Sequence, residues 1–222
     1  MVNTPNPPKE PGRRERRKET TRREIIEAAM KLFEKKGIFA TTVEEITKAA
    51  DVGKGTFFNY FPTKEAILSA LAERQLGIVD RAVESAQQAP AVRPILLTFC
   101  KEISAGHGRS QMMLRSLLGN VLNNKLLFEF FSSVLAKARE RLALIIARGQ
   151  ELGEIRRDLS AEEIARCMQH GIFGTNFIWA ASKPSDLLAW QEKQFDIFWR
   201  GIATSDSPVA PGPTFKEGGN KK

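Results

Sequence analysis

Residues 41–64 have the sequence TTVEEITKAADVGKGTFFNYFPTK, and this stretch decides the fold. It predicts two short helices joined by a tight turn. Thr42 is a suitable N-cap and Glu45 follows it three residues later, which is the pattern of a capping box. Apolar residues then recur at helical spacing until the period breaks, where we expect Gly53 to supply the turn.

The second of these helices is expected to begin near Lys54 and to end before Pro62. Phe57 and Phe61 lie four residues apart, so they share a helix face that can point into a core. The opposite face would then carry Lys54, Thr56, Phe58, Asn59 and Tyr60. A face with two rings, an amide, a hydroxyl and a base but no acid suits the major groove of DNA, which offers polar base edges and apolar methyl groups. The alternative is that the two rings pack against a neighbouring helix.

The segment from about residue 21 to residue 71 resembles the N-terminal domain of TetR-type (tetracycline-repressor-like) transcriptional regulators. The matching residues are Ile26, Ala29, Phe33, Gly37, Thr41, Thr42, Ile46, Ala49, Ala50, Val52, Lys54, Gly55, Thr56, Phe57, Phe58, Asn59, Tyr60, Phe61, Lys64 and Glu65. The resemblance covers roughly a quarter of the chain, and so long a run in this order is specific. It implies an all-α protein of about nine helices, with an N-terminal three-helix helix-turn-helix DNA-binding domain and a C-terminal helical domain for ligand binding and dimerisation.

The same resemblance implies a set of residues that contact operator DNA. They are Thr42, Lys54, Gly55, Thr56, Phe58, Asn59, Tyr60 and Lys64. The threonines and Lys64 would fix the protein on phosphates, whereas Lys54, Asn59 and Tyr60 are better placed for base edges. A lysine in the first turn of a helix opposes the helix dipole, so Lys64 makes more sense if an anion lies against it; a solvated lysine is the alternative. Phe58 occupies a position that is often tyrosine in such regulators, and it lacks the hydroxyl that meets a phosphate there.

Composition and charge favour a polyanionic partner. The 222 residues carry a formal net charge of +8 and an isoelectric point near 9.7, which suits nucleic acid or an anionic membrane surface. No stretch is apolar for the roughly 18 residues that a membrane-spanning helix needs, and the N-terminus lacks the apolar region of a signal peptide. Cys100 and Cys167 are most simply free thiols, although two cysteines do not exclude a disulfide. We therefore expect a cytoplasmic protein.

Composition at the two termini, together with the resemblance, implies that the chain divides into four parts. They are a flexible basic arm at residues 1–20, the DNA-binding domain at 21–66, the helical effector-binding and dimerisation domain at 67–203, and a disordered tail at 204–222. The arm is expected to be solvated in the free protein and to bind phosphate or the minor groove when the domain docks. A helix capped by Thr63 and running to about Gln88 would lead from one domain into the next as a rigid connector.

The second domain is predicted to consist of helices throughout. The expected limits are Pro94 to Gly106, Met112 to Gly119, Asn123 or Asn124 to Gly153, Ser160 to about Ala181, and Pro184 or Ser185 to Ile202. Ser160 and Glu163 form a second capping box. No internal repeat of fixed period is present.

The last two helices carry the pattern of a dimer interface. Spacings of three and four connect Leu188, Gln191, Phe195 and Phe198, and the preceding helix contributes Met168, Gly171 and Thr175. Ordinary packing within one chain is the alternative, but the resemblance favours a homodimer with a four-helix interface. A two-fold dimer would place its recognition helices about 34–36 Å apart on a palindromic operator.

An apolar set in the second domain suggests an effector pocket. Its members are Phe99, Met112, Met113, Phe128, Phe131, Phe173 and Phe177. Such residues are by default core, but regulators resembling this chain bind a small-molecule effector among these helices and then lose affinity for DNA. The sequence does not identify the compound.

No catalytic, metal-binding or cofactor-binding motif is found. His107 and His170 lie outside any metal-ligand or nucleophile pattern, and phosphate-loop and dinucleotide fingerprints are missing. The leading hypothesis is a cytoplasmic, homodimeric TetR-family repressor that regulates transcription, is no enzyme, and leaves double-stranded operator DNA when it binds an effector. The alternative is a basic helical protein that docks on an anionic membrane or an acidic protein partner through residues 13–23.

Overall fold

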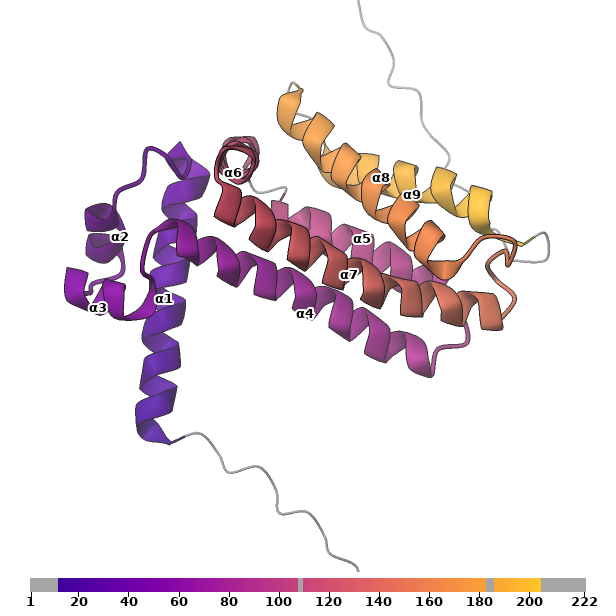
Figure 1. Cartoon of the computed structure of the whole chain (residues 1–222), viewed down its shortest axis with the longest axis horizontal. Coiled ribbons are helices and arrows are strands. Elements are labelled where there is room, and N and C mark those ends of the chain that lie inside the picture. Colours follow the sequence, from indigo (N-terminus) through magenta and orange to yellow (C-terminus); the bar gives the residue numbers. More distant parts are fainter. Residues whose placement is uncertain (1–11, 108–109, 183–185, 205–222) are drawn as a thin grey trace, which may run out of the picture. The chain divides into compact units, whose positions relative to one another are not determined.

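The computed structural model describes residues 12–107, 110–182 and 186–204. Within these ranges the chain forms nine α-helices and one 3-10 turn, and its only β-type pairing is an isolated bridge between Ile155 and Ala203 (Figure 1). The chain divides into two compact units, Met1–Leu71 and Ala72–Lys222. The predicted all-α architecture, with a helix-turn-helix unit followed by a larger helical unit, is confirmed.

The first unit contains α1 (Arg13–Lys36), α2 (Val43–Ala49) and α3 (Lys54–Tyr60). Its small core is built from apolar side chains of all three helices, four of which come from α1. Phe33 of α1, Ile46 of α2 and Phe57 of α3 are completely buried, and Phe61, just beyond α3, is 3% exposed. Phe57 and Phe61 point inward as predicted, and these four residues fix the back of α3 to the rest of the unit.

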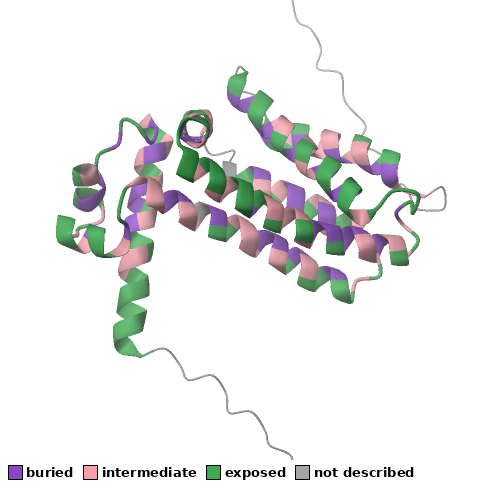
Figure 2. Cartoon of the chain, in the orientation of Figure 1, coloured by how far each residue is buried: buried purple, intermediate pink, exposed green. Residues whose placement is uncertain are grey.

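Helix α1 begins at Arg13, within the segment 1–20 that was predicted to be a flexible arm. Gly12 precedes it as the N-cap, and its amide donates a hydrogen bond of 3.1 Å to the Glu15 carboxylate. No proline lies between Gly12 and Lys36, so the helix can extend toward the N-terminus as far as Arg13. The part of the predicted arm from Arg13 to Thr20 is therefore helical and solvent-exposed, as the green turns at the start of α1 show in Figure 2. Residues 1–11 of the arm lie outside the described residues.

The turn between α2 and α3 has the predicted place but a different residue in the special conformation. Asp51 adopts the left-handed region with φ of 53°, whereas Gly53 has an extended φ of −72° and serves as the N-cap of α3. Aspartate tolerates this region better than most residues because its short polar side chain can hydrogen-bond locally. The prediction that Gly53 supplies the turn is wrong in this respect.

The connector begins as a 3-10 turn, Glu65–Ile67, and continues as α4 (Leu68–Gln87). The amide of Ala66 donates to the Thr63 hydroxyl at 3.3 Å, as expected of a cap. The contact-based division falls between Leu71 and Ala72, so α4 starts in the first unit and continues in the second.

The second unit comprises the rest of α4 and five further helices. These are α5 (Arg93–His107), α6 (Gln111–Asn123), α7 (Lys125–Glu151), α8 (Ala161–Ala181) and α9 (Leu187–Ile202). Helix α8 packs against α7 and α9, and α5 also packs against α9 (Figure 1). Leu96, Ile145, Ala165 and Trp199 are among the residues of its buried core.

Of two glycines predicted to end helices in this unit, one lies inside its helix and the other follows its helix end as predicted. Gly119 lies inside α6, which continues to Asn123, because a single glycine costs a helix only about 1 kcal/mol. Asn124 caps α7 by accepting a hydrogen bond from the Leu127 amide at 3.1 Å. Gly153 follows the end of α7 with φ of 77°, a conformation that favours glycine, as predicted.

Candidate DNA-binding face and effector cavity

The outward face of α3 is exposed as the sequence predicts. Lys54, Phe58 and Asn59 are exposed, and Thr56 and Tyr60 are partly exposed. The Phe58 ring is 52% exposed and meets the buried Phe57 ring edge to face, with centroids 5.4 Å apart. The alternative of a buried Phe58 is therefore wrong. Figure 2 shows most of α3 in the colour of exposed residues.

One residue of α2 changes the charge of this face. The Glu44 carboxylate lies 2.5 Å from the Lys54 ammonium, and both side chains are about 60% exposed, at 60% and 59%. The hydrogen bond from Lys54 is the main reason that the pKa of Glu44 falls below its ordinary value. The sequence of α3 alone does not reveal this acid, which lies in the first turn of α2.

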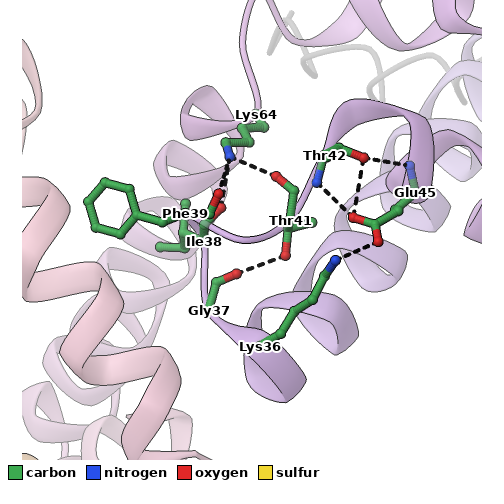
Figure 3. A network of polar contacts seen from close by, with 8 residues as sticks. All are labelled: Lys36, Gly37, Ile38, Phe39, Thr41, Thr42, Glu45 and Lys64. Atoms are coloured by element: carbon green, nitrogen blue, oxygen red, sulfur yellow. Dashed lines mark hydrogen bonds and ion pairs between the residues drawn. The ribbon is translucent and has the colours of Figure 1, made fainter.

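Lys64 occupies a different position from the one predicted. Its ammonium donates hydrogen bonds to the carbonyl oxygens of Thr41 at 2.6 Å, Ile38 at 2.9 Å and Phe39 at 3.2 Å (Figure 3). An ammonium has three donors, so these carbonyls occupy all of them. The side chain is only 21% exposed. In this arrangement Lys64 holds the segment between α1 and α2 and has no donor left for a DNA phosphate.

Thr42 and Glu45 form the predicted capping box. The Glu45 amide donates to the Thr42 hydroxyl oxygen at 3.2 Å, and the Thr42 amide donates to the Glu45 carboxylate at 2.9 Å (Figure 3). Lys36 adds a 2.5 Å contact to the same carboxylate. The hydrogen bond from Lys36 and then that from the Thr42 backbone lower the pKa of Glu45 to about 2. Thr42 is exposed where α2 begins, and its hydroxyl also donates to the Glu45 carboxylate at 3.2 Å.

The second unit contains an apolar cavity of about 420 Å³. Five of the seven predicted pocket residues line it, namely Phe99, Phe128, Phe131, Phe173 and Phe177. Met112 and Met113 do not line it: Met112 is 50% exposed and Met113 is buried elsewhere in the packing of α6. At 100° per residue, Met112 lies on the opposite side of α6 from Leu114, whereas Met113 is on the buried side but does not line the cavity. Three leucines of α6, Leu114, Leu117 and Leu118, line the cavity in their place.

The cavity lining has no charged residue among the described residues that form it. Its polar members are Gln75, Ser132, Gln169 and Asn176. The amide of Gln169 is already engaged, because it donates to the Leu135 carbonyl at 2.8 Å and accepts from Arg139 at 3.4 Å. The volume lies within the roughly 300–1,000 Å³ of small-molecule pockets, and the lining suits a molecule that is mostly apolar.

The predicted dimer seam faces the protein's own core. Met168, Gln191 and Phe195 are at most 1% exposed, and the Phe195 ring stacks on Trp199. Gly171 is covered by the Gln194 side chain, since an added Cβ would lie 2.2 Å from its Nε2 atom. A heptad-like spacing shows which residues share a face, but it does not show whether that face meets the same chain or a second one. Phe198 and Thr175 are partly buried, and Leu188 is 41% exposed.

Large apolar side chains of the same two helices are exposed. Ile178 of α8 is 61% exposed, and Trp190 and Ile197 of α9 are 56% and 75% exposed. Trp190 and Ile197 are seven residues apart and therefore lie on one side of α9. We call Ile178, Trp190 and Ile197 the exposed α8–α9 face.

Other chemistry is not apparent in the described part of the chain. No cluster of three metal-binding side chains occurs there, and none of the described helices combines the length and apolarity needed to cross a membrane. Cys100 and Cys167 are both free thiols, as predicted. Burial raises the pKa of the Cys100 thiol, so this group stays neutral and unreactive. His170 is exposed.

Comparison with known proteins identifies the family. The sequence profile described as "Bacterial regulatory proteins, tetR family" matches residues 25–71. The transcriptional regulator TcmR of Streptomyces glaucescens is 31% identical over 172 residues, which are 72% of this chain and 68% of that protein. The chain belongs to the TetR family. It is a DNA-binding transcriptional regulator, and its relatives in this family are not enzymes.

Further TetR-family relatives cover more of the chain. The "Fatty acid metabolism regulator protein" of Bacillus subtilis is 29% identical over 183 residues, 81% of this chain and 94% of that protein. The structure of Thermus thermophilus FadR, a TetR-family repressor in complex with lauroyl-CoA, is 31% identical with a TM-score of 0.60, covering 86% of this chain and all of that one. The match to the regulator YerO of Bacillus subtilis, by contrast, spans half of that protein. No relative supports the alternative of a protein that docks on membranes or acidic partners.

Proposed function

We propose that this TetR-family protein is a homodimeric repressor that acts in the cytoplasm and leaves a palindromic operator when a small, mostly apolar molecule fills the cavity. The observation that carries the proposal is the face of α3. It exposes Lys54, Phe58 and Asn59, while Phe57 anchors the helix from behind. A helix held in this way can enter the major groove without losing its packing.

The proposed DNA contacts divide into two classes. Lys54, Asn59 and Tyr60 would reach base edges, with Phe58 against sugar or a thymine methyl group. Thr42 and Thr56 would bind phosphates, and Gly55 lets the backbone approach because no atom lies within 4 Å of the place of a Cβ. Lys64 supports this surface from behind by holding the carbonyl groups between α1 and α2.

The exposed first turns of α1 supply further positive charge. Arg13, Arg14, Arg16, Arg17 and Lys18 are all exposed on that helical segment. Bases arranged in this way suit contact with the phosphate backbone beside the operator, since such contacts add affinity without sequence preference.

Dimerisation is proposed to use the exposed α8–α9 face. Ile178, Trp190 and Ile197 are large, apolar and accessible, whereas Met168, Gln191 and Phe195 of the seam first predicted are buried in the chain's own core. Two copies of this face, related by a two-fold axis, would form a four-helix interface, which is a common way for one protein surface to pair with itself.

The effector is proposed to act through α4. This helix contributes Gln75 and Val79 to the cavity lining, and its first residues belong to the first unit. A ligand shifts such a system only if it binds one arrangement of α4 better than the other. The lauroyl-CoA of the FadR complex suggests an acyl chain as one kind of occupant, with any charged head group outside the uncharged lining.

A footprint on the DNA that flanks the protein's own gene tests the proposal. We expect purified protein to protect two half-sites related by a dyad, about 34–36 Å between centres or a multiple of that distance. The Asn59→Ala variant should lose protection at defined positions, whereas the Lys48→Ala variant, altered on an exposed position of α2, should keep the pattern. Absence of any protected palindrome would favour the docking alternative.

A further inference from the structure

The residues that line the cavity fall into a buried set and an exposed set. The buried set, which we call the floor, comprises Val79, Phe99, Leu117, Leu142, Ile172 and Asn176, and these residues are at most 7% exposed. The exposed set, which we call the mouth, comprises Leu122, Phe128, Ser132, Leu135, Phe173 and Phe177. The five apolar residues of the mouth are 37–69% exposed.

The mouth lies on three helices of the second unit. It is formed by the end of α6, the first half of α7 and the middle of α8, and the first turns of α7 are mostly in the colour of exposed residues in Figure 2. A closed cavity would have buried residues on every side. The cavity therefore opens to solvent at the mouth, and a molecule bound in it has one end deep in the unit and the other end near water.

The floor offers a bound molecule no hydrogen bond. Asn176 is its one polar residue, and the Nδ2 group of Asn176 donates to the Ile172 carbonyl oxygen at 2.8 Å and to the Ser104 hydroxyl oxygen at 3.3 Å. These two bonds use both N–H groups of the amide. The Oδ1 atom has almost no accessible surface, so a molecule in the cavity cannot reach it either. The main-chain groups of the floor are bonded within their helices.

The remaining polar residues of the lining lie outside the floor. Ser132 is exposed at the mouth, and Gln75 and Gln169 are partly exposed. Gln169 is also engaged, since its amide donates to the Leu135 carbonyl at 2.8 Å and accepts from Arg139 at 3.4 Å. A polar group of a bound molecule can therefore keep water only if it stays away from the floor.

This arrangement has an energetic consequence for the bound molecule. A hydroxyl, carbonyl or amide placed against the floor would lose its hydration and gain no hydrogen bond in return, which lowers affinity. An unpaired charge placed there would be far more costly still. The same groups at the mouth keep their hydration, whether they are neutral or charged.

We infer that the effector is an amphiphile whose polar groups are confined to one end, with an unbroken hydrocarbon body on the floor and the polar end at the mouth. The inference rests on the proposed function, because it names the chemical class of the molecule that fills the cavity. It is more specific than a fit to apolar surface, since it excludes molecules of equal polarity that carry the polar group in the middle.

Three alcohols serve as probes. 1-Undecanol and 6-undecanol have the same atoms, but only the first can leave its hydroxyl at the mouth while its chain fills the floor. Calorimetric titration of the full chain should give an affinity for 1-undecanol on the order of tenfold higher. 6-Methyl-1-undecanol has a branch in the middle and its hydroxyl at the end, so it controls for shape and should bind about as tightly as 1-undecanol.

Variants assign the preference to the floor. Leu117→Asn places a hydrogen-bonding group there, so it should narrow the difference between 1-undecanol and 6-undecanol. Leu117→Ala removes bulk at the same position without adding a polar group, and should keep the difference. If Leu117→Asn fails to fold by circular dichroism, Ile172→Thr adds a hydroxyl to the floor with a smaller change of shape.

The inference is overturned if the wild-type protein binds none of the three alcohols, or binds 6-undecanol as tightly as 1-undecanol. Equal weakening of 6-undecanol and 6-methyl-1-undecanol would also overturn it, because shape would then decide, as would an unchanged preference in the polar floor variant. Release of operator DNA is measured separately. The expected preference without release would support the inference while contradicting the proposed function, so the two can fail independently.

Discussion

The ammonium of Lys64 lies 2.6 Å from the carbonyl oxygen of Thr41, and it also binds the carbonyls of Ile38 and Phe39. Thr41 is completely buried, and its hydroxyl in turn donates to the Gly37 carbonyl at 2.8 Å. Lys64 follows α3 in the sequence, and its side chain therefore holds the segment that connects α1 to α2. The role of Lys64 is to keep α2, and with it α3, in place.

This role predicts that Lys64→Met lowers the free energy of unfolding of the first unit. Three carbonyls lose a charged donor, and a hydrogen bond to a charged group contributes about 1.5–3 kcal/mol. Affinity for DNA should fall with stability, while the slope of log affinity against log salt stays unchanged. Lys48→Met, which removes an exposed positive charge from α2, should leave stability nearly unchanged. A flatter salt slope for Lys64→Met at unaltered stability would restore the phosphate role.

The ion pair between Glu44 and Lys54 predicts that Glu44→Gln strengthens DNA binding. The carboxylate repels phosphate and occupies the ammonium 2.5 Å away, so its removal should raise affinity for all sequences. Lys54→Ala should do the opposite and, if Lys54 displaces one counterion, reduce the salt slope by about 0.9. Filter binding or fluorescence anisotropy across a range of salt concentrations measures both. Equal affinity of Glu44→Gln and wild type would show that this acid turns away from DNA.

The lowered pKa of Glu45 predicts an acid-sensitive first unit. Because the folded pKa is about 2 and the ordinary value is 4.5, the group stabilises the fold fully above pH 4.5. That contribution is lost as the pH falls from 4.5 through 2. Glu45→Gln keeps the capping geometry but removes the ion pair with Lys36, so its stability should vary less with pH in this window. Hydrogen exchange of α2 amides reports the change, and identical pH profiles for the two proteins would refute it.

The side chains packed around Gly149 in the second unit leave no room for a larger residue. A Cβ at this position would lie 2.6 Å from methyl groups of both Ile155 and Val92, which are completely buried. Gly149→Ala should therefore destabilise the protein by about 1–3 kcal/mol, the usual cost of overpacking. Gly77→Ala in α4 would approach only an Arg81 guanidinium nitrogen at 3.8 Å, and should stabilise by up to about 1 kcal/mol. Thermal unfolding measures the stability of both variants. If the two substitutions have similar effects, the side chains around Gly149 move apart easily enough to accept a methyl group.

The exposed α8–α9 face predicts a dimer that one charge can break. Ile197→Glu should yield monomers in sedimentation experiments and lower operator affinity, because a buried charge at the interface would be unpaired. Leu144 is likewise an exposed apolar residue but lies on α7, so Leu144→Glu should remain dimeric. If Ile197→Glu sediments as a dimer, the chain pairs through another surface.

The sequence was sufficient for the features that depend on local chemistry. The Thr42–Glu45 cap, the inward Phe57 and Phe61, and the exposed face of α3 all follow from helical spacing and side-chain type. It also predicted all five phenylalanines that line the cavity. The cap and the two faces of α3 are determined by residues close together in the chain.

Features that depend on distant partners could not be predicted. The Lys64 ammonium meets carbonyls more than twenty residues earlier in the chain, and nothing in its own helix indicates this. The pattern of Gln191 and Phe195 predicted a packed face correctly but left open which chain it packs against. The Asn176 amide is engaged with Ser104 from another helix, so only the folded structure shows that it offers a bound molecule no hydrogen bond.

Helix α4 supplies Gln75 and Val79 to the cavity wall, while its first turn belongs to the DNA-reading unit. Residues of one helix thus belong both to the wall of the proposed effector cavity and to the DNA-binding unit. A substitution of Gln75 can leave the affinity for the effector unchanged and still abolish the release of operator DNA. It can also turn a molecule that releases the protein from DNA into one that keeps it bound. Substitutions in α4 can therefore change the response to the effector while the aromatic residues of the cavity and the operator sequence stay the same.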